Sequence, residues 1–244
     1  MVFFYKAVLT MMETLPVGFT LTAFRAVTPI DEANIWEFVL DRNAERIGVK
    51  RRTPALENLK KIFEATFHLA NTVGFRAMTL RDLSSETGLS MGGLYGYIQT
   101  KDQLAAMIED AVRHVSAQLP DWFAHVEKPA DRLECLVRAF IYSAEILQPW
   151  LFFVFLESRT LPAEQKNVAK EAELRFHSHL ADLIEADGAH DHEGAFLLAA
   201  HCMAFIQDWY VKRWKYHAAK VDVDVFAASA VELLRSRLKA GRAA

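Results

Sequence analysis

The chain has 244 residues, of which 52% are hydrophobic and 24% charged, with a formal net charge of −3. This composition excludes intrinsic disorder, and the slightly acidic total excludes a protein that coats nucleic acid with its whole surface. No stretch reaches the roughly 18 uncharged apolar residues of a membrane span, so we expect a cytoplasmic protein without a membrane partner.

An N-terminal extension, residues 1–49, precedes the first sharply bounded helix. Residues 1–30 are mixed, with the β-prone stretch "VGFTLTAFRAV" between two prolines. The pattern then changes at "DEANIWEFVLDRNAERIG", residues 31–48, whose apolar side chains lie on one broad side. Acidic residues at its start and a glycine at its end predict one helix here.

Residues 50–105 carry the pattern of a compact helical head. The basic run "KRR" at 50–52 is followed by Thr53 and Pro54, which suit an N-cap and the first helical position. An apolar stripe continues from there to Gly74, a candidate left-handed helix cap. These features predict the first helix of the head.

Two shorter helices are expected next in the head. Thr79 and Asp82 have the spacing of a capping box, and the helix that they open is expected to end at Gly88. Ser90 is an N-cap candidate for a further short helix that reaches about Ile98. The head is therefore predicted to contain three helices.

The helix after the head begins at a capping box of Thr100 and Gln103 and is expected to end at Pro120. The remaining chain shows helical periodicity and no alternating strand pattern. The expected helical stretches are 121–127, 130–147, 150–158, 162–186, 192–217 and 223–239.

Together these patterns predict an all-α fold class. The expected parts are the extension at 1–49 with one helix, a helix-turn-helix head at 50–105 and a larger helical body at 106–244. The two cysteines, Cys135 and Cys202, lie far apart in apolar helical settings. This favours buried thiols over a zinc site.

Four glycines, at positions 88, 92, 93 and 96, fall within nine residues of the head. A phosphate-binding loop is excluded because neither of its glycine patterns is present. A membrane GxxxG dimer has the right spacing but lacks the apolar context. Two interpretations remain: a helix-turn-helix, in which missing side chains let the second helix approach the DNA major groove closely, and a structural helical hairpin.

The charge distribution agrees with a DNA-reading head. Residues 50–101 contain eight Lys or Arg and four Asp or Glu, a net charge of +4. Since the whole chain carries −3, the remainder carries −7. A basic head on an acidic body is typical of a DNA-binding domain joined to a domain that does not bind DNA, although a solvated basic face has the same charge.

The segment "TLRDLSSETGLSMGGLYGYIQTKDQL", residues 79–104, resembles the DNA-binding head of the tetracycline-repressor (TetR) family. The shared features are a threonine-started helix, a glycine turn, an "LY-x-[HY]-[FV]" stretch and a "[SN]K-x-x-L" helix entry. The resemblance covers about residues 54–108. It implies a transcriptional regulator that binds double-stranded operator DNA, associated with the nucleoid, with a ligand-binding and dimerisation body.

The resemblance also implies DNA-contacting positions. Arg81 is expected to reach a base edge or phosphate, and Tyr95 to stack near the sugar-phosphate or a thymine methyl. Tyr97 and Lys101 are expected to grip phosphates, and the basic run to contact the minor groove or phosphates. The full set is Lys50, Arg51, Arg52, Thr79, Arg81, Ser90, Met91, Gly92, Gly93, Tyr95, Tyr97 and Lys101.

Two features depart from the family pattern. Gly92, Gly93 and Gly96 stand where the family often has side chains, so sequence preference is expected to rest partly on DNA shape. The extension is longer than the family's usual short arm.

For the body, the resemblance implies a homodimer through the last two long helices, about 192–217 and 223–239, although an intramolecular core has the same apolar stripe. The aromatic segment "QPWLFFVFLES", residues 148–158, is either core or the wall of a pocket for a hydrophobic ligand such as an acyl-CoA, a fatty acid or an aromatic compound. The candidate ligand residues are Phe140, Tyr142, Trp150, Phe153, Glu157, Phe176, His177 and Trp209.

No cofactor or metal is expected, because the histidines near 177–201 do not present three or four converging ligands. An enzyme is also not expected, since no nucleophile elbow, nucleotide loop or HExxH motif occurs. The sequence favours a repressor released from a palindromic operator by a small hydrophobic ligand. The alternatives are a constitutive or partner-controlled DNA-binding protein of the same fold, and a helical module that only imitates the motif.

Overall fold

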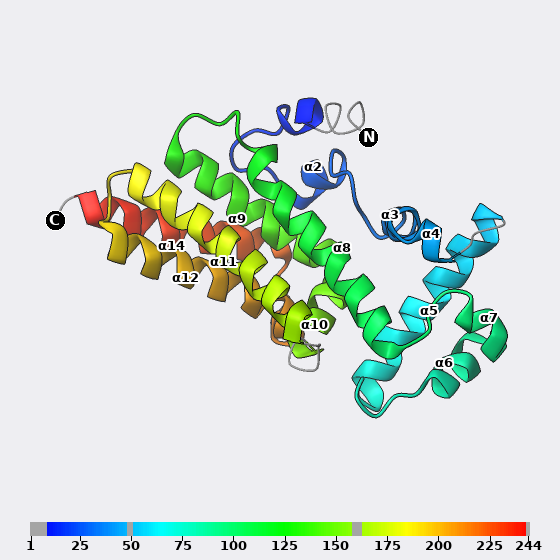
Figure 1. Cartoon of the computed structure of the whole chain (residues 1–244). Helices are drawn as coiled ribbons and strands as arrows, with labels where there is room; N and C mark the ends of the chain where they lie inside the picture. Colours follow the sequence, from blue (N-terminus) through cyan, green and yellow to red (C-terminus); the bar gives the residue numbers. More distant parts are fainter. Residues whose placement is uncertain (1–8, 48–50, 158–162, 243–244) are drawn as a thin grey trace. The chain divides into compact units, whose positions relative to one another are not determined.

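The computed structural model describes residues 9–47, 51–157 and 163–242, and every regular element within these ranges is a helix (Figure 1). The helices divide into two compact units. The head unit consists of Ile30–Arg113 and Pro149–Ala169, and the body unit consists of the described residues up to Pro29, His114–Gln148 and those from Lys170 onward. The all-α prediction is confirmed.

The division into units differs from the predicted boundaries at 49/50 and 105/106. The extension is shared between the units, and residues 149–169 belong to the head unit although they follow the first body helix in the chain. The reason is packing: the aromatic side chains of this later segment are buried against the first helix of the head.

The head unit contains α3 (Ile35–Arg42), α4 (Ala44–Ile47), α5 (Arg52–Thr72), α6 (Leu80–Thr87), α7 (Met91–Tyr95), the first part of α8 (Lys101–Trp122) and most of α10 (Gln148–Glu157). The single helix predicted over 31–48 is two helices, interrupted at Asn43. Helix α5 begins before the predicted cap, with Arg51 at the N-cap position, so Thr53 lies inside the helix. Pro120 also lies inside α8 and does not end it.

Trp150 of α10 is the centre of the aromatic core of the head unit. Its ring centroid lies 5.1 Å from that of Phe63 and 5.4 Å from that of Phe67, both on α5. Trp36 of α3 packs on the same indole at 5.4 Å. All four side chains are buried, so one cluster holds three helices together through large apolar areas and favourable ring geometry.

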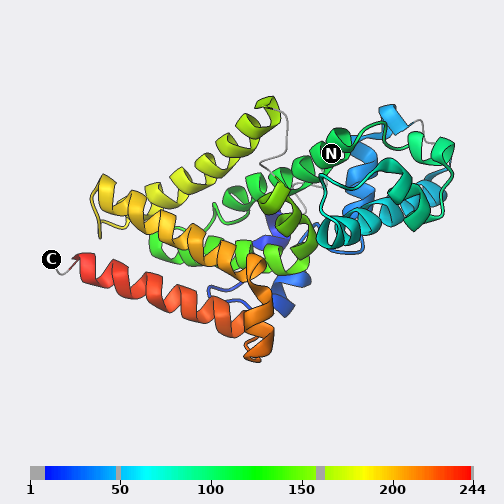
Figure 2. The same ribbon diagram turned by 90° about the horizontal axis from the view of Figure 1, so that it is seen from below.

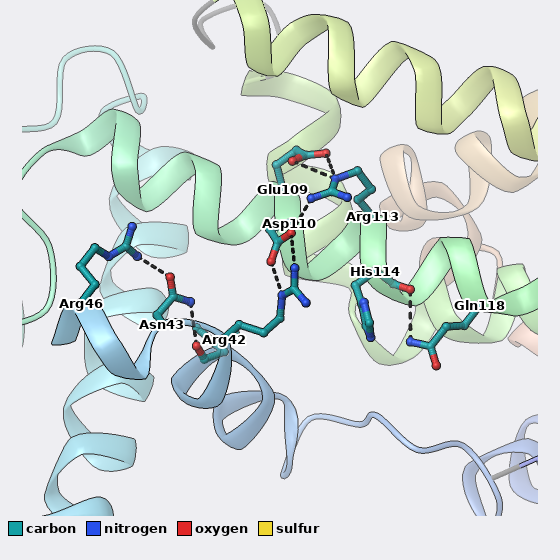
Figure 3. A network of polar contacts seen from close by, with 9 residues as sticks. Arg42, Asn43, Arg46, Glu109, Asp110, Arg113, His114 and Gln118 are labelled. Atoms are coloured by element: carbon teal, nitrogen blue, oxygen red, sulfur yellow. Dashed lines mark hydrogen bonds and ion pairs between the residues drawn. The ribbon is translucent and has the colours of Figure 1, made fainter. Parts of the chain in front are cut away.

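An ion-pair network attaches α3 to α8 within the same unit (Figure 3). The Arg42 guanidinium points toward the Asp110 carboxylate, with Nη2 donating to Oδ1 at 2.9 Å. Arg113, one turn further along α8, forms ion pairs with both Asp110 and its neighbour Glu109. Burial raises the pKa of the Glu109 carboxyl, which the neighbouring Arg113 charge opposes. The network fixes which face of α3 meets α8.

The body unit contains α2 (Leu21–Arg25), the rest of α8, α9 (Pro129–Ile146), most of α11 (Ala163–Ala186), α12 (His192–Val211), α13 (Arg213–Ala218) and α14 (Val223–Arg242). Helices α12 and α14 pack on α9 and run side by side (Figure 2). The helix predicted over 192–217 is divided at Lys212, and of the stretch 121–127 only the first two residues are helical. Both cysteines are buried as expected, and burial raises the pKa of each thiol to about 12.

The first part of the extension belongs to the core of the body unit. Phe19 and Phe24 are almost fully buried, and Phe19 stacks on Phe123 at 5.6 Å. The Leu21 amide donates to Asp224 Oδ1 at 2.8 Å, and the Tyr142 hydroxyl donates to the same oxygen at 2.6 Å. Burial and this hydrogen bond raise the pKa of the Tyr142 phenol, so it stays protonated as the donor. The β-prone stretch is therefore a short helix and loops, held by side chains distant in sequence.

We predict that Trp36→Ala lowers the free energy of unfolding by about 3–5 kcal/mol, because it empties a fully packed aromatic site. The matched control is Trp214→Ala, since Trp214 is 72% exposed, and it is expected to change stability by less than about 0.5 kcal/mol. Chemical denaturation of both variants measures the difference. Equal effects would contradict the assignment of the extension to the head core.

Candidate DNA-binding site

Helices α6 and α7 form a helix-turn-helix. Thr79 caps α6 through a complete capping box: its hydroxyl oxygen accepts the Asp82 amide at 3.2 Å, and the Asp82 carboxylate accepts the Thr79 amide at 2.8 Å. Gly88 ends α6 in the left-handed conformation, with φ of 70°. A side chain at this position would strain the backbone. The predicted start and end of this helix are confirmed.

Helix α7 is shorter than predicted, ending at Tyr95 instead of Ile98. Ser90 caps it as expected, its hydroxyl oxygen accepting the Gly93 amide at 3.1 Å. Leu94 and Ile98 are fully buried, and the Ile98 amide still donates to the Leu94 carbonyl at 3.0 Å. These two anchors hold a glycine-rich helix that has little helical preference of its own.

The glycines in and directly after α7 differ in how much room the protein leaves for a side chain. A Cβ atom added at Gly92 would have no neighbour within 4 Å, and one at Gly93 would make an ordinary 3.4 Å contact with Ser90 Oγ. Both residues are exposed and neither has a positive φ. Neither packing nor backbone conformation within the chain therefore requires them to be glycine. Gly96 differs, because its Cβ would lie 3.2 Å from the Gly93 carbonyl oxygen.

The side chains around these glycines have unequal access to a partner. Arg81 on α6 is exposed, and Tyr95 on α7 is 48% exposed. Met91 is half-buried. Tyr97 is also half-buried, and its hydroxyl oxygen accepts Asn58 Nδ2 of α5 at 3.0 Å, which leaves the hydroxyl hydrogen to donate.

Three expected phosphate contacts look different in the structure. The Thr79 hydroxyl donates its hydrogen to Asp82 Oδ2 at 2.8 Å, so this hydrogen serves the capping box. The Arg52 guanidinium pairs with Asp41 at 2.6 Å and lies 3.6 Å from Glu37. Lys101 directs its ammonium at three backbone carbonyl oxygens of the head. Each of these side chains thus has a partner within the chain, and its contact with a phosphate stays a prediction.

Of the other two residues of the basic run, Lys50 and Arg51, the structure describes only Arg51. Arg51 is exposed at the N-cap position of α5. Lys50 lies outside the described residues.

The eight candidate ligand residues do not form one site. Trp150, Phe153 and Glu157 lie in the head unit, and the other five lie in the body unit. In the body, Phe140 packs on Phe176 at 4.9 Å, while His177 Nε2 lies 3.1 Å from the Phe196 carbonyl oxygen. Tyr142 serves the buried contact with the extension, and Trp209 Nε1 donates to Glu145 at 3.1 Å. Seven of the eight side chains are buried, the exception being half-buried Glu157.

One hollow in the head unit gathers two of the candidates with residues of α5. The empty space in this hollow is about 230 Å³, which includes open solvent. Its lining is Phe67, Ala70, Asn71, Pro149, Phe152, Phe153, Leu156 and Glu157. Sequence reasoning missed the α5 residues because 78 to 90 positions separate them from the α10 residues of this lining.

Within the described ranges, no group of three or more His, Cys, Asp or Glu side chains is placed to hold a metal ion. No single helix in these ranges is long and apolar enough to cross a membrane.

Comparison with known proteins identifies the helix-turn-helix. The model of the bacterial regulatory proteins of the tetR family matches residues 62–108, which include all of α6 and α7. The HTH-type transcriptional regulator PksA of Bacillus subtilis (strain 168) is 27% identical over 150 residues. That match spans 61% of this chain and 63% of PksA, which is less than two thirds of the relative's length.

Solved structures share the fold. A TetR-family transcriptional regulator from Bordetella parapertussis 12822 superposes with a TM-score of 0.62 at 17% identity, over 71% of this chain and 91% of that one. AibR, solved in complex with isovaleryl coenzyme A and operator DNA, superposes with a TM-score of 0.60 at 16% identity, over 72% and 97%. The chain therefore carries a helix-turn-helix similar to that of the tetR family of bacterial regulatory proteins, on a helical fold shared with solved TetR-family regulators.

Proposed function

We propose that the chain is a repressor that binds a palindromic operator and is released from it by a small hydrophobic ligand. The observation that carries the DNA-binding part is the pair Gly92 and Gly93. They are exposed on the second helix of a helix-turn-helix, and neither the space around them nor their backbone conformation requires glycine. A close external surface explains why a helix would keep two residues that each weaken it by roughly 1 kcal/mol.

In the proposed complex, the N-terminal half of α7 enters the major groove with its backbone close to the base edges. Arg81 and Tyr95 are exposed and can add hydrogen bonds to base edges or contacts with a thymine methyl. Ser90, Met91 and the Tyr97 hydroxyl complete the proposed contact surface. With so few side chains on α7, we expect DNA shape to contribute to specificity.

A palindromic operator requires two heads, and α12 and α14 offer the proposed dimer face. Of the apolar stripe predicted on these helices, Met203, Ile206 and Leu234 pack inside the chain. Leu197 and Leu233 are instead 51% and 54% exposed. Apolar side chains of this size on two neighbouring helices support a four-helix bundle with a second copy.

The proposed ligand class comes from the relatives and from the chemistry of the body. AibR, which shares the fold, was solved with isovaleryl coenzyme A and operator DNA. The body unit of this chain has buried aromatic side chains such as Phe140 and Phe176, which suits an acyl chain more than a polar ligand. The alternative is a same-fold DNA-binding protein that is constitutive or controlled by a protein partner.

We predict that Gly92→Ala raises stability but weakens operator binding by about tenfold or more, equivalent to 1.4 kcal/mol. The new methyl has open space within the chain, and alanine favours a helix by up to about 1 kcal/mol over glycine. Thermal unfolding and operator titration measure the two effects. Ser178→Ala, at an exposed helical position of α11, is the control for a gain in helix preference. Unchanged affinity in Gly92→Ala would refute the close approach.

We predict that Leu233→Arg makes the protein monomeric and strongly weakens operator binding without unfolding the chain, because it places a charge in an apolar dimer face. The matched control is Leu174→Arg on α11, where the side chain is 59% exposed. Sedimentation and operator titration distinguish the two variants. If both variants stay dimeric, the dimer forms through another surface.

The ligand part is tested on the operator itself. Selection from a random DNA pool first identifies the operator, and short- and long-chain acyl-CoAs, fatty acids and aromatic compounds are then titrated against the complex. We expect one class to lower operator affinity, and the operator must weaken its binding by the same factor. A compound that binds tightly and leaves operator affinity unchanged would favour the constitutive or partner-controlled alternative.

A further inference from the structure

Lys101 is the first residue of α8, and its side chain crosses to the turn that joins α5 to α6. The ammonium donates to the carbonyl oxygens of Phe75 at 3.1 Å, Arg76 at 2.8 Å and Met78 at 2.6 Å. A lysine ammonium has three N–H donors, so each donor has one acceptor. The contact is thus saturated by the protein itself.

These carbonyls come just before the DNA-reading helices. Gly74 turns the chain with φ of 86°, and the amides of Ala77 and Met78 donate back to its carbonyl. The turn carbonyls beyond it point to Lys101, and the very next residue, Thr79, is the N-cap of α6. Lys101 therefore closes the turn from which the helix-turn-helix starts.

The same turn is joined to the aromatic core. The Lys101 ammonium lies 5.6 Å from the centre of the Phe75 ring, within the range of a cation–π contact. The same ring makes a T-shaped contact with Phe153 of α10, at 4.9 Å between centroids. One lysine thus links the start of α8, the α5–α6 turn and, through Phe75, helix α10.

We infer that Lys101 is a positioning residue, which fixes α6 and α7 for DNA binding by holding the turn at Phe75–Met78, and not a phosphate ligand. This inference rests on the proposed function only for its effect on operator affinity. The effect on the turn is measured without DNA, so the failure of one can be told from the failure of the other.

The experiment compares Lys101→Met, which keeps the stem and removes all donors, with Lys101→Gln, which is neutral but keeps two N–H donors. Hydrogen–deuterium exchange of peptides covering residues 75–83, thermal unfolding and the salt dependence of operator binding are measured. Lys61→Met, an exposed position on α5 of the same unit, is the control for the effect of losing a lysine on exchange and thermal stability.

If Lys101 is a positioning residue, the amide hydrogens of residues 75–83 exchange several-fold faster in Lys101→Met than in the wild type. This variant also unfolds at a temperature several degrees lower and binds all DNA sequences more weakly. The slope of log affinity against log salt stays as in the wild type. Lys101→Gln restores part of the protection although it lacks the charge. If Lys101→Met does not fold, exchange and salt slope in Lys101→Gln decide alone.

A phosphate ligand gives the opposite pattern. Losing one phosphate contact makes the salt slope shallower by about 0.9 in both neutral variants and leaves exchange at 75–83 unchanged. Either a shallower slope or unchanged exchange overturns the inference.

Discussion

The packing of Trp150 against Phe63 and Phe67 is the contact on which the head unit depends. It buries an aromatic helix from the middle of the chain against the long helix that supports the helix-turn-helix. Large flat side chains suit this task, because they bury much apolar area with few rotatable bonds. Helix α7 has only five residues, so its orientation comes from this scaffold and not from its own stability.

In the helix-turn-helix, the residues that fix the backbone conformation are different from those on the exposed surface. Caps at Thr79 and Ser90 and the left-handed Gly88 define where the two helices begin and where the first ends. Two buried side chains, Leu94 and Ile98, anchor α7 to the core of the head unit. The outer surface is then left with glycines that nothing inside the chain demands. Glycines lower the intrinsic stability of α7, and the caps and the buried anchors offset this loss. A local loss of stability that other contacts offset is expected of a functional surface.

The connection between the two units is covalent at four points. The chain passes from one to the other after Pro29, Arg113, Gln148 and Ala169. The extension adds one of these crossings, with Phe19 buried in the body unit and Trp36 buried in the head unit. Helix α8 is therefore one of several covalent connections between the two units. Residues of the extension are thus part of the core of each unit.

Sequence alone determined the features that depend on neighbouring residues. The all-α class, the capping box at Thr79, the glycine turn at Gly88 and the N-cap at Ser90 follow from short-range spacing, because caps and helical periodicity involve residues at most four apart.

Tertiary structure decided what depends on distant partners. Whether Lys101 faces a phosphate or three carbonyls depends on a turn 23 to 26 residues away, and the place of Trp150 depends on α3 and α5. Such choices result from the competition among all available partners for one side chain, which no local pattern records.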